Sequence, residues 1–366
     1  MYLFQLEKNE EIKYRIKEAE ASIPKNLFFK KKIKKYILQF NSSYQTSVKE
    51  NDNVYAELFL SRENKDFRIK NIKKAEEIEK IIIILHGFTS STAHLRNYYY
   101  FIGKSILQNY SCLFVNLPFH LNRTPAGEKS GERLIHNRDM ETLLFFHQSV
   151  TDIKKAISIT KEFLEQKYKI NKIDFSICGI SLGGMVSVIT MAWENRINKG
   201  IFIQCGGNWD QIYWNSLVRV IMRGCFIDKE KIKREQAEKF YSAIFEFISK
   251  YKEINPEKID PELKEYPLLG SYTQKTWFLS DPLTFANKIK PENVIMINSK
   301  FDFLFCREST NQLWEELSRP KIYWLNNFHT SSVLCNSKVL RLIFNFLDNI
   351  DNINSKKLNI YNNKLN

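Results

Sequence analysis

The chain has 366 residues, 43% of them hydrophobic, which is enough for a sizeable core and for additions to a minimal enzyme domain. Lysine and arginine (55) exceed aspartate and glutamate (41), giving a net charge of +14, but no recognisable nucleic-acid motif accompanies them, so no nucleic-acid partner is expected. The six cysteines have none of the paired spacings of metal or redox sites, so no metal site is expected.

Residues 1–54 predict an N-terminal helical extension that packs on the core. Two short helix-like patterns, at residues 7–21 and 25–40, lie on either side of a proline. The basic run at residues 30–35 is typical of a solvated helix face. Aromatic residues flank this run, so weak attraction to an anionic membrane surface is an alternative interpretation.

Residues 55–206 are expected to form the first part of an α/β core. Strand candidates at residues 55–61 and 67–72 would begin the sheet in antiparallel fashion. The five consecutive apolar residues at 81–85 predict a central parallel strand that is covered on both faces. This first part therefore predicts a sheet enclosed between two layers of helices.

The exit of the central strand contains His86 and Gly87, a sequence that indicates an abrupt turn. We interpret His86 as a structural residue that binds the loop backbone. The amide of Phe88 would then lie at the carboxyl edge of the sheet, where it is a candidate oxyanion donor.

A further strand candidate, residues 112–116, leads into a loop that contains His120 and Arg123. Both side chains would project from the catalytic edge of the sheet and are candidates for substrate contact. Arg123 in a pocket would favour an anionic or carbonyl-rich substrate. Two prolines and two glycines between Pro118 and Gly131 also fit a loop held by its own hydrogen bonds.

The strand candidate at residues 173–178 runs straight into Gly179-Ile-Ser181-Leu-Gly183-Gly184. This layout is typical of a nucleophile elbow, in which a strained serine stands between a strand and a helix. Positions two before and two after the serine approach each other closely, and glycine removes the clash. Leu182 would open the helix, so its amide is the second candidate oxyanion donor.

A serine that attacks an acyl carbon needs a base and an acid that orients the base. Hydrolases with this elbow order the three as serine, acid, histidine, and His329 is the only histidine that follows Ser181. Asp302 follows the strand candidate at residues 293–298 and is the preferred acid. Asp281 and Glu308 are the alternatives.

Residues 207–290 separate two core strands by far more than an ordinary connection and predict a helical cap or insertion. Apolar stripes at helical spacing, around residues 214–221 and 240–248, would pack on the sheet or line an apolar acyl or aryl pocket. The core would resume at 291–349, ending in a helix at 333–347. The Asn- and Lys-rich tail, 350–366, is expected to be disordered.

Together these residues resemble the α/β-hydrolase superfamily across about residues 80–349, and the loop at 117–133 resembles a poorly characterised bacterial branch of it. The resemblance implies a mostly parallel sheet of about eight strands with helices on both faces. It also implies hydrolysis through an acyl-serine intermediate without a cofactor. It does not imply a substrate.

The leading hypothesis is a carboxylesterase-like serine hydrolase of a small-molecule acyl substrate. An acyltransferase or a peptidase with the same triad, and a hydrolase-fold binding module without turnover, are the alternatives. The first residues lack a secretory pattern, and no uncharged apolar run approaches the length of a membrane span, so a cytoplasmic location is expected. The sequence leaves the oligomeric state open.

Overall fold

The computed structural model describes residues 3–6, 13–21, 33–61, 78–135, 139–221, 234–235, 238–239, 242 and 272–349. Within these residues one sheet contains nine strands in the order β1-β2-β3-β5-β4-β6-β7-β8-β9. The pairs β1–β2, β2–β3 and β3–β5 are antiparallel, and all the other pairs are parallel. The strands are β1 (Tyr14–Ala19), β2 (Lys34–Asn41), β3 (Asn53–Leu60), β4 (Glu79–Leu85), β5 (Ser111–Val115), β6 (Ile173–Ile180), β7 (Ile197–Ile203), β8 (Val294–Phe301) and β9 (Lys321–Phe328).

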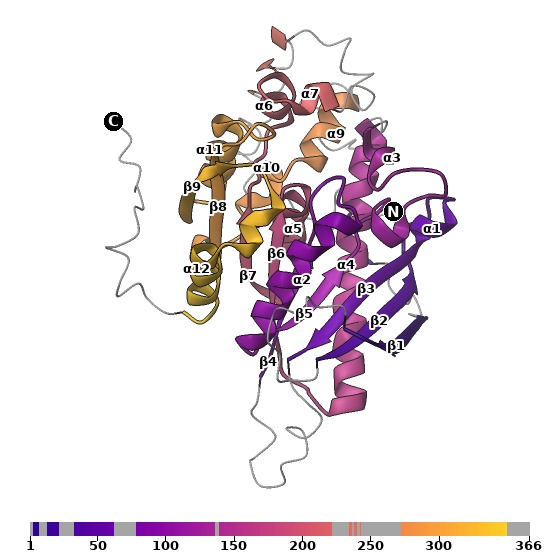
Figure 1. Ribbon diagram of the computed structural model, residues 1–366. Coiled ribbons are helices and arrows are strands. Elements are labelled where there is room, and N and C mark those ends of the chain that lie inside the picture. Colours follow the sequence, from indigo (N-terminus) through magenta and orange to yellow (C-terminus); the bar gives the residue numbers. More distant parts are fainter. Residues whose placement is uncertain are drawn as a thin grey trace.

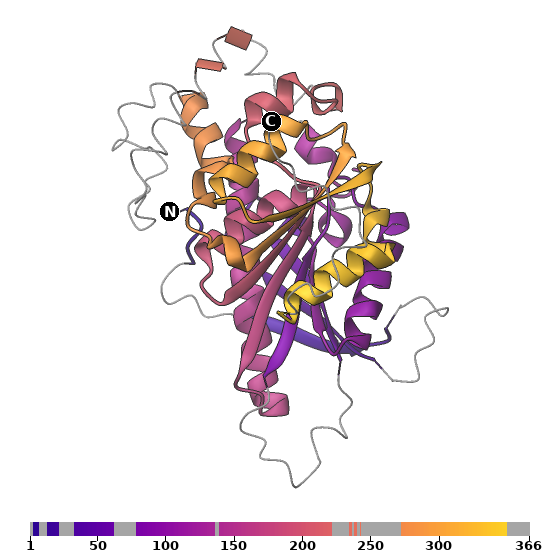
Figure 2. The ribbon, with the colours of Figure 1, turned by 90° about the vertical axis from the view of Figure 1, so that its left-hand side faces the viewer.

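Helices cover both faces of the twisted sheet (Figures 1 and 2). Helices α2 and α12 lie on one face, and α4, α5 and α10 lie on the other. The described α-helices are α1 (Lys49–Asp52), α2 (Thr92–Leu107), α3 (Glu132–Ile135), α4 (Asp139–Tyr168), α5 (Leu182–Trp193), α6 (Trp209–Trp214), α7 (Val218–Ile221), α9 (Tyr272–Ser280), α10 (Leu283–Ala286), α11 (Arg307–Glu316) and α12 (Ser337–Leu347). Short 3₁₀ helices are η2 (Leu121–Arg123), η5 (Pro291–Asn293) and η6 (Ser331–Cys335).

Strand β4 shows why the centre of the sheet has an unbroken apolar sequence. Ile81, Ile83 and Leu85 belong to the core on the α4 and α5 face, whereas Ile82 and Ile84 belong to the core on the α2 and α12 face. Alternate side chains of a strand point to opposite faces, so burial on both faces requires apolar residues at every position. The prediction of a doubly covered parallel strand is confirmed.

The prediction of helices at residues 7–21 and 25–40 is wrong over the described residues. Residues 14–19 and 34–41 form β1 and β2, which extend the sheet beyond β3. Along β2, Tyr36, Leu38 and Phe40 are buried at every second position, which is the period of a strand. Pairing with β3 along the whole of β2 outweighs the weak local preference for helix.

The described part of the basic run is also not a solvated helix face. Lys35 lies in β2 and is buried, where its ammonium group forms an ion pair of 2.6 Å with Glu57. Tyr36, an aromatic residue in the membrane interpretation, is 1% exposed. Phe28, Phe29 and residues 30–32 lie outside the described residues.

Strand β3 confirms the candidate at residues 55–61 and pairs antiparallel with β5. The candidate at residues 67–72 lies outside the described residues, as do the stripe at 240–248, apart from residue 242, and the tail at 350–366. Helix α12 begins four residues later than predicted, because Asn336 caps it by accepting hydrogen bonds from the amides of Lys338 and Val339.

Between β7 and β8 the chain forms α6, α7, α9 and α10 in the described residues. Helix α9 packs on α4, and α10 packs on α5 and α11. This insertion therefore contacts the core through the helices of one face. None of the described helices is both long enough and apolar enough to cross a membrane.

Candidate active site

Ser181 lies between β6 and α5 with φ 56° and ψ −123°, a backbone conformation that is strained for a residue with a side chain. A Cβ atom added to Gly179 would overlap the carbonyl group of Gly183. One added to Gly183 would lie 2.5 Å from the carbonyl oxygens of Leu85 and His86. The two glycines therefore allow the sharp turn, as the elbow pattern predicts.

The loop that follows β4 lies directly beside Ser181. A Cβ atom added to Gly87 would be 3.3 Å from the Cβ of Ser181 and 3.8 Å from its hydroxyl oxygen. Phe88 follows this contact, and Leu182 is the first residue of α5. An amide in the first turn has no acceptor within its own helix and lies at the positive end of the helix dipole. Both predicted oxyanion donors thus belong to segments that adjoin the serine.

The predicted acid and base are in contact. Nδ1 of His329, just after β9, is 2.8 Å from Oδ2 of Asp302, just after β8. The other carboxylate oxygen, Oδ1, accepts hydrogen bonds of 2.9 Å from the amides of Leu304 and Phe305. The His329 and Asp302 side chains are only 9% and 4% exposed. The Asp302 carboxylate is therefore fixed on both sides and determines which ring nitrogen of His329 has the proton.

The alternative acids are not in this position. The carboxylate of Asp281 accepts hydrogen bonds from the amides of Trp209 and Leu283, each 3.0 Å long, so it joins α6 to α10. Glu308 lies in the first turn of α11, as the sequence pattern suggested. Among the three candidates, Asp302 has the recorded contact with the histidine.

A pocket of about 70 Å³ opens beside the serine. Ser181 and Thr142 are its polar lining side chains, and the remaining lining residues are apolar. Phe305 lines this pocket and also stacks on the ring of His329, with the ring centroids 5.9 Å apart. Phe305 thus joins the pocket wall that contains Ser181 to the pair formed by Asp302 and His329.

We compared the chain with family models, with curated proteins and with solved structures. No family model matches the chain. A segment of 89 residues is 29% identical to the uncharacterized protein YdjC of Bacillus subtilis, covering 24% of this chain and 77% of that protein. The acylaminoacyl peptidase of Pyrococcus horikoshii aligns over 87% of this chain and 42% of its own, with 14% identity and a TM-score of 0.52. The esterase Pf2001 of Pyrococcus furiosus aligns over 89% of this chain and 95% of its own, with 15% identity and a TM-score of 0.47.

This protein has the α/β-hydrolase fold. At these identities the likeness concerns the fold. The predicted fold class is confirmed: a mostly parallel sheet has helices on both faces and a helical insertion after β7. The number of strands in the described residues is nine, because β1 and β2 join the sheet, rather than the eight that the sequence suggested.

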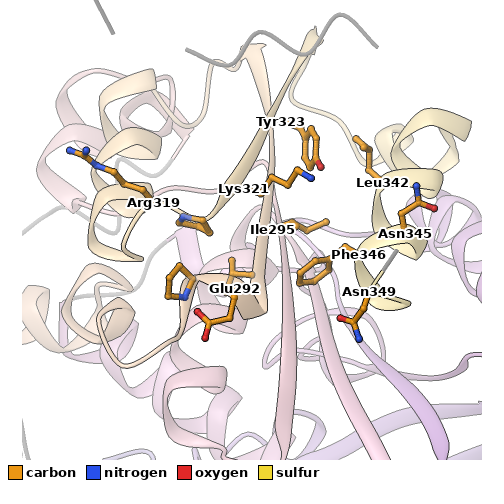
Figure 3. A pocket seen from close by; sticks show the side chains of 12 residues that line it. Glu292, Ile295, Arg319, Lys321, Tyr323, Leu342, Asn345, Phe346 and Asn349 are labelled. Carbon is orange, nitrogen blue, oxygen red and sulfur yellow. The ribbon is translucent and has the colours of Figure 1, made fainter. Parts of the chain in front are cut away.

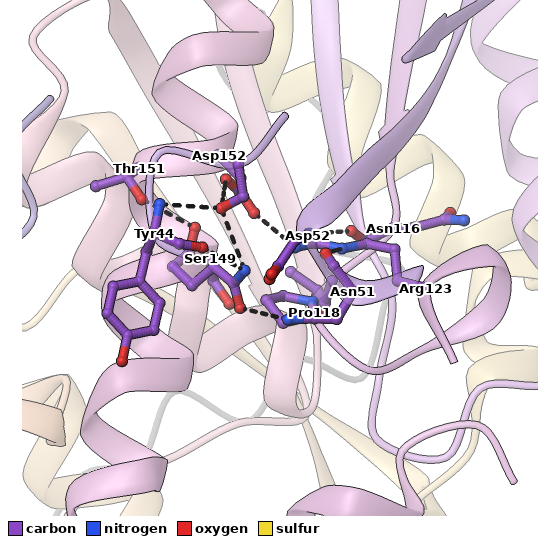
Figure 4. Close-up of polar contacts among 12 residues, drawn as sticks. Tyr44, Asn51, Asp52, Asn116, Pro118, Arg123, Ser149, Thr151 and Asp152 are labelled. Carbon is purple, nitrogen blue, oxygen red and sulfur yellow. Dashed lines mark hydrogen bonds and ion pairs between the residues drawn. The ribbon is translucent and has the colours of Figure 1, made fainter. Parts of the chain in front are cut away.

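On this α/β-hydrolase fold, Arg123 does not reach the pocket, and the expectation of substrate contact is corrected for this residue. Its side chain is fully buried, and its Nη2 forms an ion pair of 2.8 Å with Oδ2 of Asp152 on α4 (Figure 4). Its Nε and Nη1 donate hydrogen bonds to the carbonyl groups of Asn51 and Asn116. Each of the three guanidinium nitrogens thus contacts a group of the protein itself.

His120 is also fully buried and is not among the lining residues, so the same correction applies. Its Nδ1 donates a hydrogen bond of 2.7 Å to the Pro118 carbonyl, and its ring lies against His86 and Phe88, with centroids 5.0 and 6.1 Å away. Burial lowers the pKa of His120 to about 4, so the ring is neutral at neutral pH. Through its contacts with His86 and Phe88, the His120 side chain packs against the loop that follows β4.

Two more contacts join the 117–131 loop to the loop at 86–90, which follows β4 and contains the candidate donor Phe88. The hydroxyl of Ser130 donates to the Ser90 carbonyl in a short hydrogen bond and accepts from the Leu121 amide at 3.0 Å. His86 accepts a hydrogen bond of 3.1 Å from the Leu117 amide at Nε2, and its Nδ1 donates to the Gly87 carbonyl. The interpretation of His86 as a structural residue agrees with these contacts.

Sequence analysis did not identify Gln204, the residue after β7 that holds both neighbours of His329. Its side-chain amide donates a hydrogen bond of 3.0 Å to the Phe328 carbonyl, and its side-chain oxygen accepts one of 3.1 Å from the Thr330 amide. Gln204 is fully buried and has a φ of 49°. Its partners lie more than 120 residues later in the chain, so no local sequence signal could have revealed this role.

A second, larger pocket lies at the opposite ends of β8 and β9 (Figure 3). It measures about 500 Å³, and Arg319, Lys321 and Asn345 are among the residues that line it. It contains none of the predicted site residues and belongs to the end of the parallel strands where ligand sites are not expected. In the described ranges, no group of three or more His, Cys, Asp or Glu residues could hold a metal ion.

Proposed function

We propose that this protein is a serine hydrolase that cleaves neutral carboxylic esters with short, apolar acyl groups. The observation that supports it most directly is the His329–Asp302 contact of 2.8 Å, next to a pocket that contains Ser181 at a strained elbow. A buried carboxylate fixes a histidine, and the ring of that histidine stacks on Phe305, which lines the pocket that contains the strained serine. Acyl transfer by a serine uses these three groups.

In this proposal Oγ of Ser181 attacks the ester carbonyl carbon while its proton moves to Nε2 of His329. Asp302 holds the Nδ1 proton and stabilises the imidazolium ion. The amides of Phe88 and Leu182 bind the oxyanion. Collapse of the intermediate releases the alcohol, which takes the proton from His329 and leaves an acyl-serine. Water then attacks the acyl-serine and gives its proton to His329, and the carboxylic acid leaves as Ser181 regains a proton.

The pocket supports the substrate class. Its lining has no charged side chain, so an anionic acyl group would lose its hydration without a compensating partner. A volume of about 70 Å³ is small compared with pockets that enclose whole drug-sized ligands. A short acyl group fits this space, with the alcohol part of the ester outside it. We expect acetyl and butyryl esters to react faster than octanoyl esters of the same alcohol.

The decisive experiment is labelling of the native protein with a fluorophosphonate, followed by location of the adduct by mass spectrometry. We expect modification of Ser181 that His329→Ala abolishes. Ser176→Ala, which removes another buried hydroxyl of β6, is the matched control and should label normally. An adduct on a different serine would refute the assignment, and absence of labelling would favour a binding module.

Acyltransferase and peptidase activities would use the same residues, so labelling does not separate them from an esterase. A panel of p-nitrophenyl esters, with and without an added alcohol acceptor, makes that distinction. Release of free carboxylic acid at the same rate with and without the acceptor supports hydrolysis. Transfer of most acyl groups to the alcohol would support the acyltransferase alternative.

A further inference from the structure

The larger pocket, at the amino-terminal ends of β8 and β9, has the dimensions of a ligand site (Figure 3). Its volume of about 500 Å³ lies within the range of small-molecule pockets, whereas the pocket beside Ser181 measures about 70 Å³. Its walls come from η5, from both strands and from α12. A ligand in this hollow is held apart from the proposed reaction, which belongs to the carboxyl ends of the strands.

The inner wall of this pocket is apolar. Ile295 of β8, Tyr323 of β9 and Leu342 of α12 line it and are at most 7% exposed. The half-buried ring of Phe346 adds to the same wall. An organic ligand that lies on these side chains removes apolar surface from water, both its own and that of the protein.

A cation stands beside the apolar wall without an acidic partner. The ammonium group of Lys321 lies 5.7 Å from the centroid of the Tyr323 ring, and this is its recorded contact within the described residues. In Figure 3 the hydroxyl of Tyr323 points toward the same space as this ammonium group. A carboxylate beside them can accept a hydrogen bond from each.

The charges of the lining residues also favour an anion. Arg319 and Lys321 are cationic, and among the described lining residues Glu292 alone is acidic. Figure 3 shows the Glu292 carboxylate directed away from the amino end of Lys321. Arg319 contacts Glu315 at 3.7 Å, but both side chains are more than half exposed, so this ion pair is weak. The lining therefore attracts negative charge.

The carboxyl end of α12 borders the pocket and does not oppose an anion. A helix end of this kind has partial negative charge on its last carbonyl groups. Here the ammonium group of Lys199 donates hydrogen bonds of 2.9 and 2.7 Å to the carbonyl groups of Phe346 and Leu347. Because Lys199 compensates the helix end, the charge of Lys321 stays available to a ligand.

We propose that this pocket binds a carboxylate with an apolar body, such as a medium-chain fatty acid. The carboxylate lies at Lys321 and the Tyr323 hydroxyl, and the body lies on Ile295, Leu342 and Phe346. A neutral ligand would cover the ammonium group without giving it a partner, and a cationic ligand would be repelled by it. A small hydrophilic anion would make no use of the apolar wall.

Three ligands with the same chain test the preference for the head group: octanoate, octanamide and octylamine. In isothermal titration calorimetry, we expect the wild type to bind octanoate about tenfold or more tightly than octanamide, because only the carboxylate forms a charge-assisted hydrogen bond. Octylamine should bind most weakly. Equal affinities for octanoate and octanamide would overturn the proposal, as would a failure of both octanoate and decanoate to bind.

Substitutions place the ligand in this pocket. Lys321→Met should weaken binding of octanoate about tenfold or more and leave that of octanamide unchanged, whereas Lys321→Arg should keep the preference for the acid. Lys338→Met removes an exposed lysine of α12 that does not line the pocket. This matched control should bind octanoate as the wild type does. An equal loss in Lys338→Met would show a general attraction of anions and would overturn the proposal.

Asn345→Trp fills the pocket from α12 and should abolish binding of both octanoate and octanamide. Unchanged binding in this variant, at a wild-type melting temperature, would place the ligand in another pocket. If the variant fails to fold, the two substitutions of Lys321 decide alone. If octanoate binds only after removal of residues 350–366, that segment of the chain is the occupant instead. Either relocation overturns the proposal.

The proposed function and this binding site can fail separately. The two pockets have no lining residue in common. If a fluorophosphonate does not react with Ser181, the serine hydrolase assignment fails, and the octanoate titrations still decide whether the larger pocket binds a carboxylate. Protein that has reacted fully at Ser181 should bind octanoate with unchanged affinity. Loss of binding in the labelled protein would assign octanoate to the pocket beside the serine.

Discussion

The two oxygens of Asp302 have different partners, and this difference makes the residue sensitive to substitution. Oδ1 accepts from the amides of Leu304 and Phe305, and Oδ2 contacts His329. In an asparagine at this position, the oxygen would face the two amides, and the NH₂ group would face the histidine. Nδ1 of His329 would then have to accept, and the ring proton would move to Nε2, where it blocks transfer from Ser181.

Asp302→Asn should therefore lower turnover of p-nitrophenyl butyrate by about 10⁴. The protein should remain folded, because the shape and the hydrogen bonds to the amides are retained. Asp281→Asn is the control. The Asp281 carboxylate also accepts hydrogen bonds from two backbone amides, but these bonds join α6 to α10. A loss of less than tenfold at position 302, or a larger loss at position 281, would move the acid role away from Asp302.

Gln204 allows a test of positioning at the scale of one residue. Gln204→Met keeps the length of the side chain and removes the hydrogen bonds to Phe328 and Thr330. A displacement of His329 by about 1 Å should lower kcat by roughly 10–100-fold with little change in KM. Gln148→Met is the control, because it removes a fully buried glutamine of α4 that contacts Tyr44 and Asn51 rather than Phe328 and Thr330. Equal losses of kcat in both variants would show a general loss of stability rather than positioning.

Among the elements, the 117–131 loop supports the loop at 86–90, which contains the candidate oxyanion donor, through contacts of Ser130, His120 and His86. The loop itself is fixed by Arg123, which joins it to α4 and to α1. The resulting order of contacts runs from α4 to the 117–131 loop, then to the loop at 86–90, and finally to Ser181. Burial of an arginine is tolerated here because Asp152 and two carbonyl groups surround it.

Arg123→Ala should lower the free energy of unfolding by about 3–5 kcal/mol, since it leaves Asp152 buried without its cation. Arg133→Ala in the same segment removes a partly exposed ion pair with Glu128 and should cost about 0–1 kcal/mol. Urea unfolding measures both changes. Rates with neutral and succinyl esters of one alcohol should keep their ratio in Arg123→Ala. A changed preference for the anionic ester would show that Arg123 contacts the substrate after all.

For the whole molecule, three buried histidines make stability depend on pH. Burial lowers the pKa of His86 to about 3, and those of His120 and His147 to about 4. In the unfolded chain the pKa is about 6.5, so below that value the unfolded state binds protons that the fold does not. Their contribution to stability is complete above pH 6.5 and is lost as pH falls towards 4. Asp210, whose pKa burial raises to about 6, acts in the opposite direction.

Urea unfolding at pH 7.5, 6 and 5 should therefore show a progressive loss of stability. Each histidine contributes up to about 1.4 kcal/mol per pH unit in this window. His147 provides a structural check, because its Nδ1 accepts a hydrogen bond of 2.9 Å from the Phe4 amide and can accept only while deprotonated. His120→Asn should flatten the pH dependence relative to the wild type. An identical slope in that variant would mean that His120 is accessible to protons in the fold.

The sequence predicted best where one physical requirement determines the residue type. Burial on both faces makes β4 an unbroken apolar run, and the close approach of backbone at Ser181 requires glycine at 179 and 183. The meeting of Asp302 and His329 was predicted from the order of residues along the chain. These predictions depend on local sequence or on order alone.

Prediction failed where partners distant in sequence decide the structure. Strand β2 became a strand because β3 pairs with it, although its local pattern also fitted a helix. Arg123 has the chemistry of a substrate contact, but its ion pair with Asp152 on α4 keeps the side chain buried inside the protein. The role of Gln204 depends on a segment that follows it by more than 120 residues.

The insertion after β7 provides Trp209, Ile212 and Val218 to the pocket wall, whereas Ser181, Asp302 and His329 all follow strands of the sheet. In the proposed enzyme, the residues that select the substrate and the residues that break the bond would thus be encoded by separate stretches of the gene. An exchange of the inserted stretch between homologues would redirect selectivity while the reaction geometry stays in place. If the proposed function holds, new ester selectivities could arise by changes in the insertion alone, with the residues that follow the strands unchanged.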